Sequence, residues 1–328
     1  MASYFRRWRR LAAAAIGGVI ALHAVAAAGQ TWPSRPVTLV VPFTSGTTSD
    51  LVARALGEHL SRALGQPIVI DNRGGAGGNL GGALVARAAP DGYTLLLATT
   101  GPAATNKLMY KDMPFDPQRD FAPIVLIGKS PVIIVARRDL PATTLKDLID
   151  FAKANPDKLN AGFPGNGTLG HVTGELLKQR TGITFSQVQY RGSTPIITDL
   201  LGEHIDLAMD SMAAYVPNIK EGKLRALAIA GAARWPGLPN VPTVAEAGVP
   251  IEASVWYALL APTGTPPEII AKVNAAANEA LKAQQSKDIF DNLGIVAAGG
   301  SPTDLSSFIA GELAKWAPII KAANITLE

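Results

Sequence analysis

The sequence predicts an α/β protein of two units, because three observations agree. Short apolar runs such as 37–41 alternate with helical runs such as 51–64, in the order typical of parallel strands joined by helices. The same strand–turn–helix order restarts at Leu159, far along the chain. The length of 328 residues exceeds one typical domain, and an apolar content of 48% is ample for a large core.

Each element follows from its apolar pattern and from the residues that bound it. In the first half, apolar runs predict strands at 37–41, 68–70, 93–98, 121–127 and 132–136, and helical spacing predicts helices at 51–64, 83–89 and 141–154. In the second half, the same criteria predict strands at 159–163, 187–190, 205–209, 223–229 and 255–260, and helices at 172–180, 196–201, 266–284 and 305–323. Gly65 and Pro266 have the positions that helix ends and starts favour. The glycine-rich stretch 72–82 is predicted to be a flexible connection.

The N-terminus has the three-part layout of a secretory signal. Four arginines between residues 6 and 10 precede an Ala-rich apolar stretch at 11–25 and then small residues, so we expect a signal peptide over residues 1–28, cleaved after Ala28. The alternative is an uncleaved membrane anchor, but the apolar stretch is shorter than the ~20 residues that a span needs. We therefore expect an exported protein of the periplasm, and the route, Sec or twin-arginine, stays open.

Charge and composition exclude several function classes. Loss of residues 1–28 removes four of the 30 basic residues and none of the 26 acidic ones, so the mature chain is formally neutral, the excess of basic residues gives no sign of binding to nucleic acid or membranes, and we expect no nucleic-acid partner. The absence of cysteine excludes disulfides, thiolate metal sites and cysteine nucleophiles. Because no histidine pair has ligand spacing and the carboxylates are scattered, we expect neither a metal nor a cofactor.

Two polar turns, at residues 43–50 and 165–171, are the strongest functional signals. Each follows a predicted strand, is rich in hydroxyl, amide and glycine groups, and opens a helix. Free backbone N–H groups and the positive end of a helix dipole favour an anion there. Each turn could also simply cap its own helix. Together, the two turns predict two lobes that close on one anionic ligand.

Two kinds of enzyme are the alternatives to a protein that binds an anion between two lobes. The pattern Gly165-x-Gly167-x-x-Gly170 matches a dinucleotide fingerprint, but the acidic residue expected about 20 residues on is replaced by Tyr190-Arg191. A secreted hydrolase could use Ser45 or His171 in the same cleft, yet no serine lies in a Gly-x-Ser-x-Gly elbow. We expect a protein that is not an enzyme and keep the hydrolase as the alternative.

The motifs, taken in order, resemble the periplasmic solute-binding proteins of tripartite tricarboxylate transporters, also called the Bug family. The resemblance spans the mature chain and rests on VVPF with Gly46 and Asp50 (40–50), LGQP (64–67), DNRGGAGGN (71–79), PDGYTL (90–95), DFAP (120–123), GxGTxxH (165–171), YRG (190–192), DLLG (199–202), GKLRALA (222–228), VPTVAEAG (241–248) and APxGTP (261–266).

The resemblance implies a two-lobed periplasmic binding protein of type II-like fold, each lobe a mixed sheet flanked by helices and joined to the other by two crossing strands. We expect residues 29–130 plus 254–328 to form lobe 1 and residues 131–253 to form lobe 2, with the crossings at 121–136 and 255–260. The implied ligand is a small di- or tricarboxylate or an aromatic acid. The implied partners are the membrane subunits of a tripartite tricarboxylate-type transporter, or a sensor kinase, and the protein is expected to be a monomer.

The resemblance also implies the ligand-binding residues. They are Phe43, Ser45, Gly46, Thr47, Thr48 and Asp50 in the first turn, Gly165, Asn166, Gly167, Thr168 and His171 in the second, and Thr100, Tyr190, Arg191 and Asp210 at neighbouring strand ends, with Thr99, Gly101, Gly192 and Ser211 as softer candidates. The first turn departs from the family, since Thr47 stands where a glycine is usual and hydroxyl residues stand where prolines are usual. Threonine does not readily adopt positive φ, so we expect a first turn of different shape.

Overall fold

The computed structural model describes residues 32–322 and 325–327. The chain divides into two compact units, residues 1–34 and 35–328, and the second unit carries the fold described below. The predicted signal peptide, residues 1–28, lies outside the described residues. No helix among the described residues is long and apolar enough to cross a membrane.

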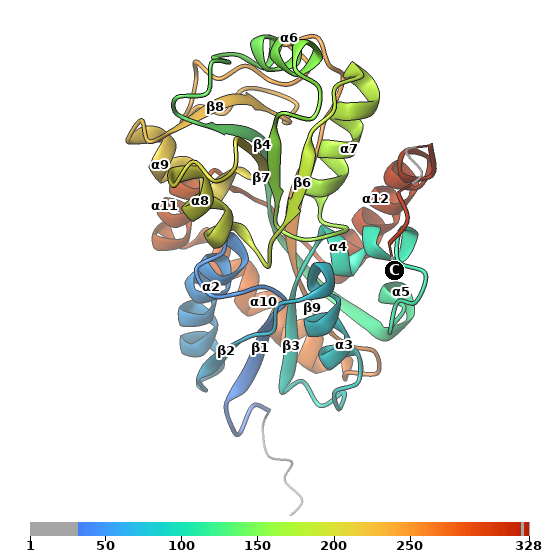
Figure 1. Cartoon of the computed structure of the whole chain (residues 1–328). Coiled ribbons are helices and arrows are strands. Elements are labelled where there is room, and N and C mark those ends of the chain that lie inside the picture. Colours follow the sequence, from blue (N-terminus) through green and yellow to red (C-terminus); the bar gives the residue numbers. More distant parts are fainter. Residues whose placement is uncertain (1–31, 323–324, 328) are drawn as a thin grey trace, which may run out of the picture. The chain divides into compact units, whose positions relative to one another are not determined.

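The first sheet is mixed and begins with parallel pairs. β1 pairs in parallel with β2 on one side and with β3 on the other, whereas β9 runs antiparallel to both β3 and β4 (Figure 1). The strands, in order across the sheet, are β2 (Ile68–Asn72), β1 (Val37–Val41), β3 (Thr94–Thr99), β9 (Ser254–Pro262) and the first part of β4 (Phe121–Arg137), with β10 (Val296–Ala297) beside β4.

The second sheet shares β4 with the first. The last part of β4, from Val132 to Arg137, pairs antiparallel with β7 and β8, and β5 pairs in parallel with β6 and β7. A second link lies just before β9, where the Ala253 carbonyl accepts from the Val132 N–H at 2.9 Å and the Ala253 N–H donates to the Ala230 carbonyl at 2.8 Å. The remaining strands are β5 (Asn160–Phe163), β6 (Ser186–Gln189), β7 (Leu207–Ser211) and β8 (Leu224–Ile229).

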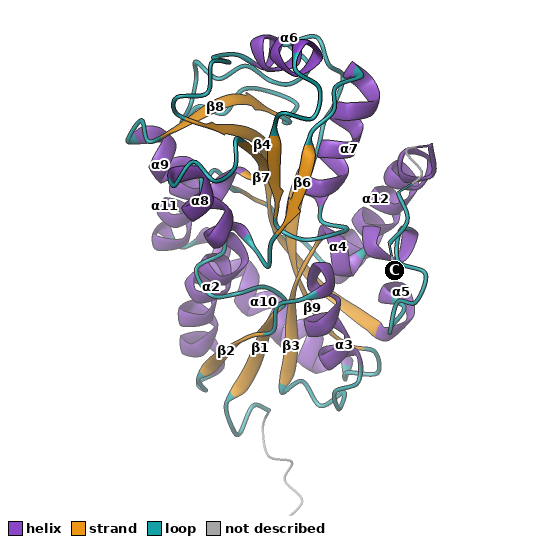
Figure 2. Ribbon diagram, viewed as in Figure 1, coloured by secondary structure: helices purple, strands orange, loops and turns teal. Residues whose placement is uncertain are grey.

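Helices and short 3₁₀ turns connect the strands and cover the sheets (Figure 2). The helices are α2 (Thr48–Leu64), α3 (Asn79–Ala86), α4 (Thr100–Ala103), α5 (Pro117–Asp120), α6 (Leu145–Ala154), α7 (Leu169–Thr181), α8 (Ser193–Leu201), α9 (Val216–Lys220), α10 (Pro267–Lys282), α11 (Gln284–Leu293) and α12 (Pro302–Ala322). The 3₁₀ turns are η2 (Ala76–Gly78), η3 (Thr105–Leu108) and η4 (Met212–Ala214).

The sequence of α2 accounts for its boundaries. Thr47 has extended backbone geometry at the N-cap, and Gly65 ends the helix in the left-handed conformation with φ of 73°. Val52, Leu56 and Leu60 are buried and recur every fourth residue, so they form one apolar face of the helix. The same pattern of strand, turn and amphipathic helix recurs at α7, which also ends on a left-handed glycine, Gly182.

The structure corrects the expected gap between residues 127 and 132. β4 is one continuous strand through Gly128 and Pro131, because β9 continues to pair with it there. A Cβ at Gly128 would lie 2.8 Å from the Val296 carbonyl oxygen, so the glycine marks the close approach of β10 and not a turn.

The predicted flexible connection at 72–82 is also corrected. Helix α3 begins at Asn79 and not at Ala83, and its glycines pack tightly: a Cβ at Gly81 would lie 2.9 Å from Pro42 Cα, and one at Gly82 would lie 2.6 Å from the Phe115 ring. These glycines allow helix–sheet contact, which is a packing role that composition alone does not distinguish from flexibility.

The C-terminal helix is tied to the first sheet through one carboxylate. Glu312 of α12 accepts hydrogen bonds from the indole N–H groups of Trp256 on β9 at 3.0 Å and of Trp316 at 3.2 Å. Both tryptophans are almost fully buried. Glu312 therefore satisfies two donors that would otherwise be buried without an acceptor.

We expect Glu312→Ala to lower the free energy of unfolding by about 2 kcal/mol, because it leaves these indole N–H groups unpaired. Glu312→Gln retains one carbonyl oxygen and should lose less. Glu279→Ala, which removes an exposed ion pair with Lys282, is the control and should change stability by less than about 0.5 kcal/mol. Urea denaturation measures all three, and equal effects of the Glu312 and Glu279 variants would contradict the role of Glu312.

Candidate functional site

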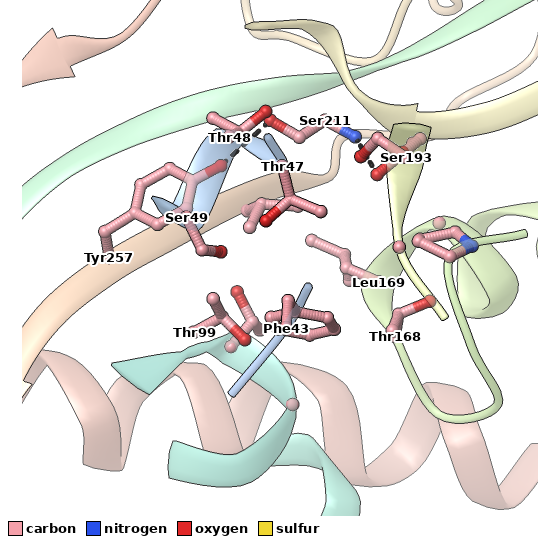
Figure 3. Close-up of a pocket in the computed structure, with 17 residues that line it drawn as sticks. Phe43, Thr47, Thr48, Ser49, Thr99, Thr168, Leu169, Ser193, Ser211 and Tyr257 are labelled. Carbon is pink, nitrogen blue, oxygen red and sulfur yellow. Dashed lines mark hydrogen bonds between the residues drawn. The ribbon is translucent and has the colours of Figure 1, made fainter. Parts of the chain in front are cut away.

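A pocket lies where the carboxyl ends of parallel strands from both sheets meet. It is formed by the segments that follow β1, β3, β5, β6 and β7, together with the start of β9 (Figure 3). Ligand sites of α/β proteins favour this edge of the sheet. The pocket holds about 470 Å³ of space free of atoms, part of it open to solvent. Its lining residues are Phe43, Thr47, Thr48, Ser49, Thr99, Thr100, Gly101, Pro164, Thr168, Leu169, Gly170, Gly192, Ser193, Asp210, Ser211, Val255 and Tyr257.

The first turn is held by a carboxylate. Gly46 takes a left-handed φ of 81°, and its N–H donates to Asp50 Oδ2 at 2.9 Å. The same carboxylate accepts from Ser45 Oγ at 3.2 Å and from Arg54 Nε at 2.9 Å. Burial opposes ionisation of Asp50, yet the hydrogen bonds from Arg54 and Gly46 outweigh it and lower the pKa of the carboxyl. Thr47 Oγ1 donates to the Thr44 carbonyl at 2.8 Å and so braces the turn.

The second turn repeats this construction with a neutral ring. Gly167 has a left-handed φ of 79°, and its N–H donates to His171 Nδ1 at 3.3 Å, four residues on. Thr168 Oγ1 donates to the Gly165 carbonyl at 2.7 Å, as Thr47 does in the first turn. Burial lowers the pKa of His171, which favours the neutral imidazole that accepts this bond. Asp50 and His171 therefore have the same role in two separate turns.

Asp50 and His171 bond to the turns without lining the pocket, and the starts of the helices face into it. Thr48 and Ser49 of α2, Leu169 and Gly170 of α7, and Ser193 of α8 all line the pocket. The first N–H groups of a helix have no partner within the helix, and the helix dipole is positive there. Three helix N-termini thus converge on one pocket, an arrangement that suits a negatively charged group.

The side of the pocket formed by β7 and β9 carries a buried hydrogen-bond network. Ser211 Oγ and Tyr257 Oη lie 3.0 Å apart (Figure 3). The preceding residue, Asp210, accepts from the Ser211 N–H at 2.6 Å and from Tyr215 Oη at 3.1 Å. Burial raises the pKa of Asp210 to about 6, although hydrogen bonds from Ser193, Ser211 and Tyr215 oppose the rise.

The raised pKa of Asp210 links the stability of the fold to pH. The folded protein holds this proton more tightly than the unfolded chain, whose pKa is near 3.8. The contribution to the free energy of unfolding is therefore fully present below about pH 4 and is lost as the pH rises through about 6. At neutral pH the site therefore contains a buried, ionised carboxylate that destabilises the fold.

One buried hydroxyl in the pocket lacks a well-aligned partner. Thr48 is only 3% exposed, and among the described residues its Oγ1 makes no hydrogen bond of ordinary geometry, although the Tyr257 hydroxyl is near enough to interact with it. Tyr257 Oη already bonds to Ser211 Oγ (Figure 3). A buried hydroxyl without a well-aligned partner is costly, so Thr48 Oγ1 has capacity for a further hydrogen bond in the pocket.

The structure separates the predicted site residues into three groups. Those that line the pocket are Phe43, Thr47, Thr48, Thr100, Thr168 and Asp210, together with the softer candidates Thr99, Gly101, Gly192 and Ser211. Those that line an adjoining cavity, formed with the glycine-rich residues 74–78 and Tyr110, are Gly165, Asn166, Tyr190 and Arg191. Those that line neither are Ser45, Gly46, Asp50, Gly167 and His171, which shape the two turns instead.

The ligand-binding list from the sequence omitted several lining residues. Ser49, Leu169, Gly170 and Ser193 lie in the first turns of helices whose starts the sequence placed too late. Pro164, Val255 and Tyr257 were also missed. Tyr257 enters the pocket because β9 pairs it with Thr99, and that long-range register leaves no local signal in the sequence.

The expected difference in shape at Thr47 has a simple outcome. Thr47 has φ of −75°, an ordinary extended conformation, and the neighbouring Gly46 supplies the positive φ.

The pairing of a serine nucleophile with a histidine base, which a hydrolase would need, is not formed by Ser45 and His171. His171 accepts from Gly167 and packs edge-on against Phe163, while Ser45 donates to Asp50. Among the described residues, no group of three His, Cys, Asp or Glu side chains could hold a metal ion.

Contacts between the two sides of the pocket hold its mouth together. Thr44 Oγ1 donates to the Arg191 carbonyl at 3.1 Å, and Tyr110 Oη donates to the Asn166 carbonyl at 2.9 Å. Gly77 also approaches Asn166 closely, since a Cβ on Gly77 would lie 2.2 Å from the Asn166 oxygen. Gly77 is thus the point where the glycine-rich loop and the second turn touch.

We expect Gly77→Ala to push these two segments apart and to speed amide hydrogen exchange at residues 74–78 and 165–168. Gly65→Ala is a matched control, because Gly65 has a similar φ of 73° but no atom within 4 Å of its Cβ position. Both variants carry the same backbone strain of about 1 kcal/mol, and only Gly77→Ala adds the clash. Unchanged exchange in Gly77→Ala, measured by mass spectrometry, would show that the contact does not hold the mouth.

Comparison with known proteins identifies relatives along nearly the whole chain. Residues 52–325 match the family described as "Tripartite tricarboxylate transporter family receptor". The structure of Rpa4515 with adipate, from R. palustris, is 40% identical with a TM-score of 0.87, over 90% of this chain and 99% of that one.

Two further solved structures have the same fold. The periplasmic binding protein BugD is 34% identical with a TM-score of 0.87, over 90% of this chain and 100% of that one. MatC (Rpa3494) with bound malate, from Rhodopseudomonas palustris, is 33% identical with a TM-score of 0.85, over 88% of this chain and 100% of that one. The predicted α/β periplasmic binding protein fold is confirmed.

Proposed function

Because the chain belongs to the family of tripartite tricarboxylate transporter receptors, in which proteins bind solutes and do not catalyse reactions, we propose that its pocket captures a small carboxylate. The observation that carries the proposal is the convergence of the N-termini of α2, α7 and α8 on one buried pocket. Adipate in Rpa4515 and malate in MatC are both small dicarboxylates. A di- or tricarboxylate or an aromatic acid is therefore the ligand class we propose for this chain.

The proposed capture is a closure of two lobes on the ligand. Lobe 1 comprises residues 29–130 plus 254–328, and lobe 2 comprises residues 131–253. Support comes from β4, which pairs in one sheet up to Pro131 and in the other from Val132 onward. A hinge at this crossing would bring the start of α2 toward the starts of α7 and α8. The ligand drives closure only if it binds the closed state more tightly, which holds when its oxygens reach N–H groups of both lobes.

Delivery of the ligand completes the proposal. We propose export to the periplasm by the signal at residues 1–28, and transfer of the carboxylate, as a monomer, to the membrane subunits of a tripartite tricarboxylate-type transporter. The family to which the chain belongs supports the transporter as the partner over the sensor kinase. The proposed site residues are the lining residues of the pocket, with Asp50 and His171 positioning the turns that carry them.

We expect a small carboxylate to raise the melting temperature of ligand-free mature protein by mass action, because it binds only the folded state. A thermal-shift panel of succinate, malate, adipate, citrate and benzoate tests this, with the corresponding amides or alcohols as uncharged controls. Refolding from denaturant before the assay removes any ligand carried through purification. If no carboxylate shifts the melting temperature, or if uncharged analogues shift it equally, the proposed function is wrong.

We expect Thr48→Val to weaken binding of the carboxylate found in that panel by roughly five- to tenfold, about 1 kcal/mol, because the ligand loses one hydrogen bond. The isosteric change removes a hydroxyl that makes no hydrogen bond of ordinary geometry among the described residues, and it should leave the fold intact. Ser286→Ala is the matched control, since Ser286 Oγ is also buried and unpartnered but lies in α11. Titration calorimetry that gave the two variants equal affinities would remove Thr48 from the site.

A further inference from the structure

The pocket has an unusual charge for a site that takes an anion. Among the lining residues there is no lysine, arginine or histidine, and one carboxyl, that of Asp210. Any positive potential must then come from backbone N–H groups, chiefly at the helix N-termini, and each N-terminus is worth only a fraction of a unit charge. A carboxylate ligand would therefore enter a buried space that already holds a carboxylate.

The groups around Asp210 offer hydrogen bonds but no cation. Tyr215 Oη donates to Oδ2, the Ser211 N–H donates to Oδ1, and the Ser193 side chain also hydrogen-bonds to the carboxyl group. On β9, Tyr257 bonds to the neighbouring Ser211, and on β4 the paired residue is the apolar Ile133. These partners hold the carboxyl group in place and do not neutralise it.

The charged groups on the helices beside β7 are engaged elsewhere. In α7, the His171 ring accepts from Gly167, and burial lowers its pKa, so it contributes no charge. In α8, Asp199 accepts from Tyr190 Oη at 2.6 Å. Arg191, just before α8, is exposed, and among the described residues no cation forms an ion pair with Asp210.

Two carboxylates forced together in a low-dielectric site share a proton, because both cannot stay ionised. We propose that the pocket binds its carboxylate ligand together with one proton, which Asp210 shares with a ligand carboxylate. The inference rests on the proposed function, since it requires an anionic ligand. The proton comes from solvent and adds to the Asp210 carboxylate, and the resulting O–H donates to a ligand oxygen. Each carboxyl oxygen has two lone pairs, so the bonds from Ser211 and Tyr215 persist.

The acidity of Asp210 makes this uptake measurable near neutral pH. Burial raises the pKa of Asp210 to about 6, so the free protein at pH 7 holds the proton in roughly one molecule in ten. Binding of ligand should then take up about 0.9 proton per ligand at pH 7. The dissociation constant should rise roughly tenfold for each pH unit above about 6, or about 50-fold from pH 6 to pH 8.

The experiment compares wild-type protein with Asp210→Asn, using malate and adipate as probes. Titration calorimetry in buffers of different ionisation enthalpy gives the protons taken up per ligand. The asparagine cannot ionise, so Asp210→Asn should take up no proton beyond that of the ligand itself, and it should bind more tightly than wild type at about pH 8. Asp150→Asn, an exposed change on α6, is the charge-matched control and should behave like wild type.

Each outcome decides the inference. Binding of malate or adipate by wild type without proton uptake overturns it while leaving the proposed function intact, and this arm needs no variant to fold. Proton uptake retained in Asp210→Asn would place the proton on the ligand alone and also overturns it. Weaker binding of either probe at pH 6 than at pH 8 would show that protonation of Asp210 does not assist binding, and this result also overturns the inference. No binding of either probe at any pH would count against the proposed function itself.

Discussion

The antiparallel pairing of β4 with β9 is the constraint on which the site depends. β4 passes from the first sheet into the second at Val132, and β9 begins where Ala253 bonds to the second sheet. The two strands hold the sheets so that the carboxyl ends of β1 and β3 face those of β5 and β7. The bond between Ser211 of β7 and Tyr257 of β9 lies at this crossing. The same backbone ladder that joins the sheets therefore also sets the side of the pocket on which Asp210 sits.

On this frame, two turns use the same device to expose helix N–H groups. A left-handed glycine turns the chain, and its own N–H is captured by the side chain four residues on, Asp50 in one case and His171 in the other. One acceptor is a carboxylate with lowered pKa and the other is a neutral imidazole. Different kinds of side chain can therefore hold the turn, provided that they accept a hydrogen bond from the glycine N–H. The capture moves the polar side chain out of the pocket and leaves the first N–H groups of α2 and α7 for a ligand.

This device explains what the sequence could and could not predict. The strand–turn–helix order was predicted from the sequence, because apolar periodicity and Gly65 are local signals. The turns were identified for the same reason, and Thr47, Thr48 and Thr168 do line the pocket. Asp50 and His171 were predicted to bind the ligand. The sequence does not distinguish a polar residue at a helix start that faces the pocket from one that bonds to the turn. Tyr257 has no local signal, since its place is set by pairing with a strand far away in the sequence.

Binding by helix N-termini in place of cations has a consequence for closure. A lysine or arginine would attract an anion in the open state, whereas N–H groups act only at contact distance and in a fixed direction. In the capture that we propose, the ligand gains most of its stabilisation when α2 on one side and α7 and α8 on the other reach the same oxygens, which is the closed state. In the same proposal, ionised Asp210, whose charge burial disfavours, opposes that state until the charge is removed. Closure, desolvation and uptake of a proton then depend on one another, because the low dielectric that strengthens the N–H contacts also forbids two adjacent negative charges.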